Sequence, residues 1–310
     1  MVRNWLLRVA SRATTAMLRG VLLRESEPAS TAHISESELE RALDRLHNLV
    51  VQAEDSKRRI AAESEKLSHM ILSHDLKESL AISIMSKSAP WLGTPPRRFD
   101  IPRMLTNEEE RYYAFIGKFY QGKGRIVELG PWLGASTHHI VASLTENPRF
   151  AGERLYVFDD FVWRAAWMDQ HVSEAERLPN HASFRHLFDR YTRDIAELLR
   201  VECVKITDHD GNENCPPLSW PRGSCGPIEL IYVDCGRTIN VNTAWYNCLS
   251  PAFIPGGTLI IMQDWRVHRE VPRKWFNQTL LFTEERTSEL KLIHEVSAGC
   301  LATFLFDPAD

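Results

Sequence analysis

The chain has 310 residues, of which 44% are hydrophobic and 25% are charged, and its formal net charge is -4. This is the composition of a folded protein, and it lacks the excess of basic residues that nucleic-acid-binding domains carry. The length allows one sizeable hydrophobic core with an appendage. No run of about 18 apolar residues is present, so we expect no membrane-spanning helix.

The six cysteines are irregularly spaced and form no Cys-x-x-Cys pair, which argues against a zinc site. Cys215 and Cys225 flank a loop rich in proline and glycine, and the two are placed to form a disulfide. The alternative, which we favour, is that the cysteines are reduced and mostly buried. Reduced thiols predict a cytoplasmic location.

The first segment, residues 1–30, predicts a cationic amphipathic helix. It carries five arginines before its first acid, Glu25, and its apolar residues recur at roughly helical spacing. Such a helix favours the surface of an anionic membrane, and we expect peripheral membrane contact. Two alternatives stay open, a mitochondrial targeting sequence of the same composition and a helix that packs on its own protein.

Residues 31–90 predict one long helix. Ser35 and Glu38 have the spacing of a capping box, and apolar residues then follow an a/d seam that Ser56 and Glu63 interrupt. We therefore predict a coiled coil that joins copies of the chain into a homo-oligomer. The alternative is a long helix that folds back on the following domain.

In residues 91–310, helix-like and strand-like segments alternate. This alternation predicts an α/β domain with a Rossmann-like, mostly parallel sheet. Two strand candidates near the C-terminus are joined by a short turn with a glycine, so we expect the sheet to end in an antiparallel hairpin. The predicted strands are 125–130, 154–161, 201–208, 228–234, 258–265, 290–296 and 299–307, and the predicted helices are 107–120, 136–144, a long helical region ending near residue 200, and 244–253.

The segment 126–137, IVELGPWLGAST, joins a strand to a helix through two glycines. Gly130 lets the chain turn tightly and lets a ligand approach the backbone. Ser136 or Thr137 can cap the helix, whose first amides attract a ligand carboxylate. The pattern therefore predicts a ligand-binding turn, with an ordinary strand–turn–helix as the alternative.

The dinucleotide-binding pattern GxGxxG is absent from this turn. The spacing of Glu128, Gly130 and Gly134 instead resembles motif I of class I methyltransferases, in which the methionine part of S-adenosylmethionine rests against the turn. This resemblance implies that Glu128, Gly130, Gly134 and Ser136 bind the cofactor.

Acids also end the second and third predicted strands. A carboxylate at the carboxyl end of such a strand can accept hydrogen bonds from both hydroxyls of a ribose. By the same resemblance, Asp159 is the ribose-binding acid and Asp160 its substitute. Asp208, with its neighbours His209 and Asp210 as alternatives, is then the residue that hydrogen-bonds the adenine amine.

Two further strands end in Asp234 and in Gln263-Asp264. Parallel strands deliver their carboxyl ends to one side of the sheet, so these acids should reach the same crevice. The order of motifs over roughly residues 105–306 resembles small-molecule O-methyltransferases related to macrolide-sugar methyltransferases and to the cephalosporin-hydroxylase-like group. The resemblance implies methyl transfer to a hydroxyl of a sugar, glycan or glycosylated small molecule.

In the macrolide-sugar enzymes, acids at these two strand ends hold a magnesium ion that orients a sugar diol. The resemblance thus makes Asp234 and Asp264 candidate catalytic residues and Mg²⁺ ligands, because hard cations prefer carboxylate oxygens. Gln263 departs from the pattern, since those enzymes have a second acid there. His268 is the predicted general base, with a surface histidine as the alternative. Arg237 is either a binder of anionic substrates or a surface arginine.

Two other functions compete with this prediction. In the first, the chain is a non-catalytic assembly protein with a Rossmann-like scaffold domain, and the coiled coil carries the function. In the second, it is an oxidoreductase or hydroxylase, but no 2-His-1-carboxylate spacing is evident. We therefore expect a cytoplasmic enzyme, peripheral to the membrane, that takes a small-molecule or glycan acceptor and no nucleic acid.

Overall fold

A computed structural model of the chain describes residues 89–207, 215–265, 267, 278–296 and 299–308. The predicted cationic helix (1–30) and nearly all of the predicted coiled coil (31–90) lie outside these residues, as do Asp208 and His268. Among the residues described, no helix has the length and apolar character needed to cross a membrane.

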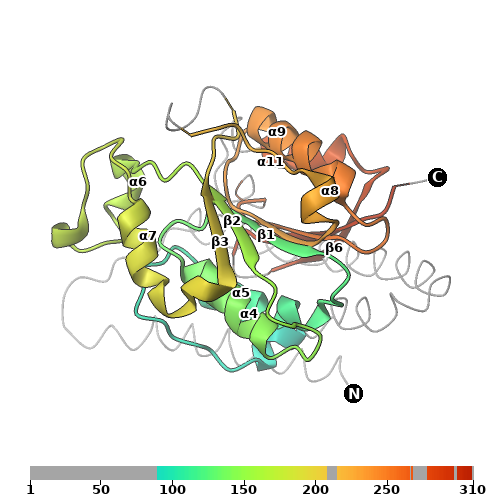
Figure 1. Cartoon of the computed structure of the whole chain (residues 1–310), viewed down its shortest axis with the longest axis horizontal. Helices are drawn as coiled ribbons and strands as arrows, with labels where there is room; N and C mark the ends of the chain where they lie inside the picture. Colours follow the sequence, from blue (N-terminus) through green and yellow to red (C-terminus); the bar gives the residue numbers. More distant parts are fainter. Residues whose placement is uncertain (1–88, 208–214, 266, 268–277, 297–298, 309–310) are drawn as a thin grey trace, which may run out of the picture. The chain divides into compact units, whose positions relative to one another are not determined.

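Within the described residues, seven strands form one sheet in the order β3-β2-β1-β4-β5-β7-β6 (Figure 1). The strands are β1 (Arg125–Leu129), β2 (Leu155–Asp159), β3 (Leu199–Cys203), β4 (Ile228–Val233), β5 (Leu259–Met262), β6 (Leu290–Glu295) and β7 (Ala302–Phe306). The first five run parallel, and β7 pairs antiparallel with both β5 and β6. The predicted Rossmann-like sheet with a C-terminal antiparallel hairpin is confirmed. The strand order reverses between β1 and β4, which is where such sheets bind ligands.

Helices cover both faces of the sheet (Figure 1). On one face lie α4 (Asn107–Ile116) and α5 (Ala135–Thr145), which pack together, and on the other lie α8 (Arg222–Cys225), α9 (Ile239–Leu249) and α11 (Gln278–Glu284). The remaining helical segments are α6 (Ala165–Met168), α7 (Arg185–Tyr191) and the 3-10 turns η1 (Pro90–Gly93), η2 (Gly117–Phe119), η3 (Glu174–Glu176), η4 (Arg193–Leu198) and η5 (Ser250–Ala252).

Each face of the sheet has its own hydrophobic core, because side chains alternate along a strand. In β1, Ile126 belongs to the core beneath α4 and α5, whereas Val127 and Leu129 belong to the core beneath α9 and α11. Since both faces are covered, the central strands are apolar throughout, as in buried parallel sheets. Glu128 is the exception in β1, and it lies on the α4–α5 side.

The prediction of a long helical region ending near residue 200 is wrong. The chain after β2 instead forms two short helices, α6 and α7, with 3-10 turns between and after them. The backbone of Trp163 exchanges hydrogen bonds with His181 (2.7 Å) and Ala182 (2.8 Å), so these residues pair across the excursion instead of winding into one helix. Pro179 lies in the break, where its ring disfavours a continuous helix.

The expectation for the cysteines is also wrong in part. Cys203, the last residue of β3, forms a disulfide with Cys215, while Cys225 is a buried free thiol. The predicted alternative pair, Cys215–Cys225, is therefore not the one that forms. The disulfide removes the support that reduced cysteines gave to a cytoplasmic location.

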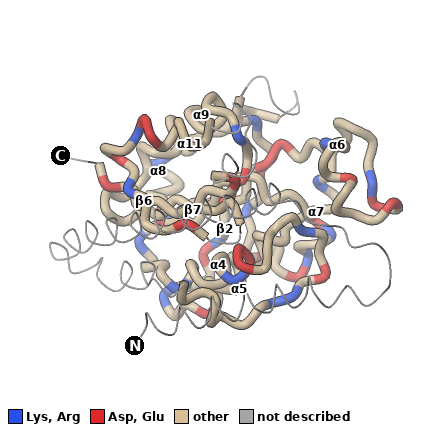
Figure 2. The backbone as a smooth tube through the Cα atoms, turned by 180° about the vertical axis from the view of Figure 1, so that it is seen from behind, with Lys and Arg blue, Asp and Glu red and all other residues tan. Residues whose placement is uncertain are grey.

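Charged residues of both signs are interspersed along the described chain (Figure 2). This distribution agrees with the expectation from composition that nucleic acid is not the partner, because nucleic-acid-binding proteins gather lysines and arginines on one face.

Candidate functional site

The sheet register brings four of the strand-end residues into one row. Leu129 of β1 pairs with Phe158 of β2 and with Val233 of β4, and Val233 pairs with Met262 of β5. The next residues along the chain are Gly130, Asp159, Asp234 and Gln263. Alternation along the strands directs the three side chains of this row toward the α4–α5 face, since the residues two positions earlier belong to that core. The crevice predicted from the sequence therefore exists, and its rim combines a bare glycine, two carboxylates and an amide.

Glu128 is placed behind this row, and it is only 2% exposed. Its two carboxylate oxygens accept hydrogen bonds from the hydroxyls of Ser136 (2.6 Å) and Thr137 (2.7 Å) in the first turn of α5. Burial raises the pKa of Glu128 to about 7, while the two hydroxyls oppose the shift. The carboxylate thus joins β1 to α5 and positions the turn between them.

The prediction that Ser136 or Thr137 caps α5 is wrong, because both hydroxyls donate to Glu128. The helix begins at Gly134 instead, which has no side chain to cap the first amides. Gly134 adopts a φ of 95°, and a methyl group there would lie 2.5 Å from the Thr192 side chain. Gly134 therefore serves close packing as well as the turn.

Gly130 connects the two halves of the crevice. Its φ is 83°, a left-handed conformation that L side chains rarely adopt, and a Cβ atom there would lie 2.3 Å from the backbone oxygen of Asp234. The glycine thus lets the β1 turn lie directly against the end of β4. Trp132 in the same turn also has a left-handed φ, of 46°, and its buried indole N–H has no hydrogen-bond partner among the described residues.

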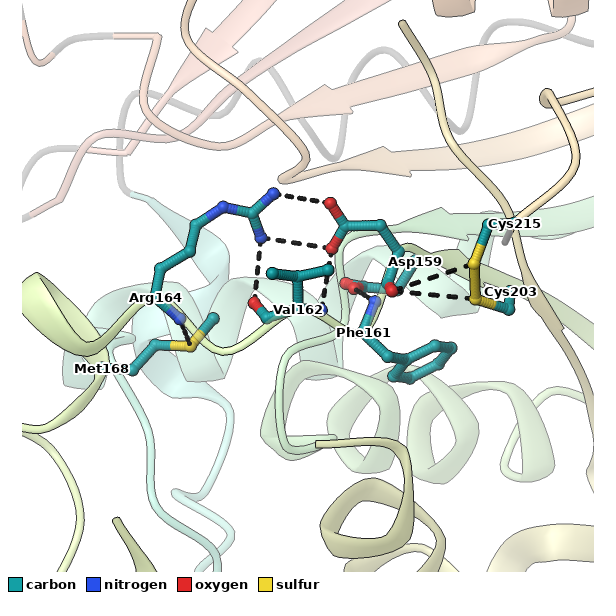
Figure 3. A network of polar contacts seen from close by, with 8 residues as sticks. Asp159, Phe161, Val162, Arg164, Met168, Cys203 and Cys215 are labelled. Carbon is teal, nitrogen blue, oxygen red and sulfur yellow. Dashed lines mark hydrogen bonds and ion pairs between the residues drawn. A yellow bond between two sulfur atoms is a disulfide. The ribbon is translucent and has the colours of Figure 1, made fainter. Parts of the chain in front are cut away.

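Asp159 and Asp160 at the end of β2 have different partners (Figure 3). Asp159 accepts a hydrogen bond from the backbone amide of Phe161 (2.5 Å), whereas Asp160 accepts two from the guanidinium of Arg164 (2.5 and 3.2 Å). Burial, together with the Asp160 carboxylate, raises the pKa of Asp159 to about 8. Asp160 is already paired with a cation, so Asp159 is the better placed of the two to accept ligand hydroxyls.

The disulfide lies against this segment (Figure 3). The sulfur of Cys203 is 3.7 Å and that of Cys215 4.0 Å from the backbone oxygen of Asp160. The covalent link therefore fixes the end of β3 beside the loop that carries the two acids.

On the other side of the crevice, Asp234 and Asp264 end β4 and β5. Asp234 is exposed to the crevice, but the surrounding protein limits its hydration, and this desolvation and the nearby Asp264 raise its pKa well above the usual range. Asp264 accepts a hydrogen bond from Nε of Arg237 at 2.6 Å and has a left-handed φ of 58°. Aspartate tolerates this conformation better than most residues do, and such strained residues cluster at functional sites.

A cavity of about 810 Å³ opens beside the end of β5. Gln263 and Asp264 line it together with the first turn of α4, η1 and the turn before β7. Two exposed apolar side chains, Leu92 (49%) and Met104 (38%), also line it. The volume lies within the range of small-molecule sites, and the lining combines apolar and hydrogen-bonding groups.

Sequence analysis missed Glu109, which connects the cavity to the strand-end row. Glu109 and Thr106 form the capping box of α4. Its Oε1 also accepts hydrogen bonds from Gln263 Nε2 (2.7 Å) and from the Cys300 amide (2.9 Å). The Thr-x-x-Glu spacing of 106–109 was a readable signal for the helix start, but the contacts with Gln263 and Cys300 depend on the folded sheet.

The residues on the β1–β2 side fit S-adenosylmethionine. The bare backbone at Gly130, the unpartnered indole N–H of Trp132 and the Asp159 carboxylate are the kinds of groups that such a molecule needs for its polar parts. No described residue occupies the role predicted for Asp208, because that position lies outside the described residues.

The residues on the β4–β5 side do not fit a divalent metal ion. Asp264 is already paired with Arg237, and the Gln263 amide N–H groups face Glu109. Among the described residues, no group of three or more His, Cys, Asp or Glu side chains is arranged to hold a metal ion. The predicted Mg²⁺ ligands Asp234 and Asp264 thus lack a third ligand and face a competing cation.

No family model and no curated protein sequence matches the chain. Among solved structures it is similar to the O-methyltransferase TomG from Streptomyces achromogenes, involved in tomaymycin synthesis and in complex with SAM, at 12% identity over 72% of this chain and 89% of that chain, with a TM-score of 0.42. It is also similar to the O-methyltransferase NovP (14% identity, 66% and 82% of the two chains, TM-score 0.44). A third similar structure is CalS11, a TDP-rhamnose 3'-O-methyltransferase of calicheamicin biosynthesis (13% identity, 74% and 93%, TM-score 0.39). These likenesses concern the fold alone.

Proposed function

We propose that the chain is an S-adenosylmethionine-dependent O-methyltransferase that acts on a hydroxyl of a sugar, a glycan or a glycosylated small molecule. The observation that carries this proposal is the row of Gly130, Asp159, Asp234 and Gln263 at the carboxyl ends of four adjacent strands. The row places a nucleoside-binding half and an acceptor-binding half side by side.

On the cofactor side, Asp159 would accept the ribose hydroxyls and the Gly130 turn would receive the methionine part. The first turn of α5 has no side-chain cap, so its amides are suited to a carboxylate. Glu128 acts through Ser136 and Thr137 and is a positioning residue for this turn.

On the acceptor side, the cavity beside β5 would hold the acceptor. A sugar ring has apolar faces and hydroxyl edges, which suit a lining that includes Leu92 and Met104 as well as Gln263 and Asp264. The carboxylates of the lining disfavour a polyanionic acceptor, because like charges repel.

When bound, the cofactor supplies a methyl group that is already activated for transfer. The acceptor oxygen forms the new C–O bond as the C–S bond breaks, and the hydroxyl proton must leave. We assign this proton to Asp234, because its raised pKa makes it a stronger base than an ordinary aspartate. Holding the acceptor in line supplies much of the rate. His268, the base predicted from the sequence, lies outside the described residues.

The proposal extends to the N-terminal segments, which rest on sequence alone. Residues 31–90 would join copies of the chain through a coiled coil, and residues 1–30 would bind a membrane surface. Together they would hold a cytoplasmic enzyme at the membrane periphery, near the assembly of envelope glycans.

Calorimetric titration with S-adenosylmethionine tests the cofactor half. We expect saturable binding that Asp159→Asn weakens by at least about tenfold, because a charge-assisted hydrogen bond is lost. Asp160→Asn is the matched control and should weaken binding less, since Asp160 is paired with Arg164. No heat with the full-length protein would reject the proposal and favour the non-catalytic assembly protein.

Mass spectrometry tests the acceptor half. The protein is incubated with a glycan or metabolite extract and a cofactor that carries an isotope-labelled methyl group. We expect a labelled methyl ether on a hydroxylated acceptor and loss of labelling in Asp234→Asn. Label on nitrogen or carbon would overturn the O-methyltransferase assignment.

A further inference from the structure

Arg237 occupies the acceptor side of the crevice where a metal ion would be expected. It lies between β4 and α9, and its Nε donates to Oδ2 of Asp264, 27 residues further along the chain. Its guanidinium also interacts electrostatically with Asp234. One arginine therefore serves both strand-end acids, and neither acid is an open ligand for a second cation.

Gln263 does not supply the missing ligand. Its Nε2 donates to Glu109, and this orientation is required because an ionised carboxylate can only accept. The same Glu109 oxygen accepts from the Cys300 amide, which fixes it in place. The amide oxygen of Gln263 accepts from the hydroxyl of Tyr113 at 3.4 Å. Both ends of the amide thus have protein partners.

We infer that the Arg237 guanidinium replaces the divalent cation at the two strand-end acids, so that the protein positions its acceptor without a resident metal ion. The acceptor clause of this inference rests on the proposed function, whereas the absence of metal binding does not. The guanidinium is permanently charged and offers several N–H donors, so it can stabilise charge that develops on an acceptor oxygen. Unlike Mg²⁺, it forms no coordinate bond to that oxygen, and deprotonation then depends on a protein base such as Asp234.

The physical reason is competition for the same oxygens. Mg²⁺ demands near-ideal octahedral geometry and gives up its water reluctantly, so it binds weakly where few carboxylate oxygens are open. Asp264 Oδ2 already accepts a charge-assisted hydrogen bond. A divalent cation beside Asp264 would also lie next to the guanidinium and be repelled by it.

Titration of the full-length protein with MgCl₂ alone, by calorimetry and by thermal unfolding, tests the inference. We expect no saturable binding to the parent protein in the millimolar range. The double variant Arg237→Gln/Gln263→Asp removes the cation and adds an acid, and it should bind Mg²⁺ at least about tenfold more tightly than the parent. Saturable Mg²⁺ binding by the parent that Asp264→Asn abolishes would overturn the inference.

Two controls keep the result interpretable. Arg200→Gln removes a guanidinium from an exposed surface pair with Glu202 and should leave the response to Mg²⁺ unchanged. Arg237→Lys retains the charge and should also remain unresponsive. If Arg237→Gln/Gln263→Asp folds, as judged by circular dichroism, and gains no Mg²⁺ binding, the inference is wrong. S-adenosylmethionine titration of the same preparations reports on the proposed function separately, so failure of one is distinguishable from failure of the other.

Discussion

The two halves of the crevice are held together in different ways. On the β1–β2 side, Glu128 binds hydroxyls 8 and 9 residues away, and Asp160 binds Arg164, 4 residues away. On the β4–β5 side, Glu109 binds Gln263 across 154 residues and the Cys300 amide across 191 residues. The first half is therefore built from contiguous motifs, whereas the second exists only once the sheet has formed.

The largest predicted effect belongs to the residue that joins the two halves. Gly130→Ala should lower the free energy of unfolding by about 4 kcal/mol, because a left-handed φ costs about 1–2 kcal/mol and overpacking against the Asp234 oxygen adds about 1–3 kcal/mol. Urea unfolding measures the loss. Gly152→Ala is the matched control, since Gly152 has a φ of 87° but nothing within 4 Å. Equal losses in the two variants would show that the contact with β4 is unimportant.

The disulfide should stabilise the β1–β2 half next most strongly. Cys203→Ser/Cys215→Ser should lower the free energy of unfolding by about 3 kcal/mol, because the cross-link restricts the unfolded chain. Reductant should destabilise the parent protein by a similar amount and leave the double variant unchanged. If alkylation of the unfolded, unreduced parent modifies all six cysteines, the pair is not formed in solution.

Glu128 should make the stability of the same half depend on pH. Its pKa rises from 4.5 to about 7 on folding, so the folded state binds the proton more tightly. The favourable contribution is complete below about pH 4.5 and is lost as the pH rises through 7. Between pH 5 and 8 the parent should lose roughly 2–3 kcal/mol more than Glu128→Gln, which stays neutral. The raised pKa of Asp159 acts in both proteins and cancels, and parallel pH profiles would contradict the prediction.

The contrast between the halves also explains what could be predicted from the sequence. Gly130, Asp159 and Asp234 were readable because each directly follows an apolar strand, and parallel strands align their ends. The hairpin of β6 and β7 was readable from two apolar runs around a glycine. The role of Glu109 was not readable, because its partners come from the other end of the chain. The pairing of Cys203 with Cys215, and of Trp163 with the His181 backbone, depends on the same kind of tertiary contact.

The smallest effect tests the long-range half directly. Glu109 accepts from Thr106, Gln263 and Cys300, so Glu109→Gln leaves at least one of these donors facing an amide N–H. We expect a loss of about 2 kcal/mol in the free energy of unfolding, the usual cost of an unmatched buried hydrogen bond. Glu108→Gln is the neighbouring control, because a glutamine oxygen can still accept from the Trp91 indole. It should lose clearly less.

A double-mutant cycle separates the long-range contact from the capping of α4. Gln263→Ala combined with Glu109→Gln should show a coupling energy of about 1 kcal/mol, since residues in one hydrogen-bond network are not additive. A Thr106→Ala variant removes the cap alone and should be additive with Gln263→Ala. If Glu109 and Gln263 prove additive instead, Glu109 acts only as a helix cap. The acceptor half would then be held by the sheet register and the Arg237–Asp264 pair alone.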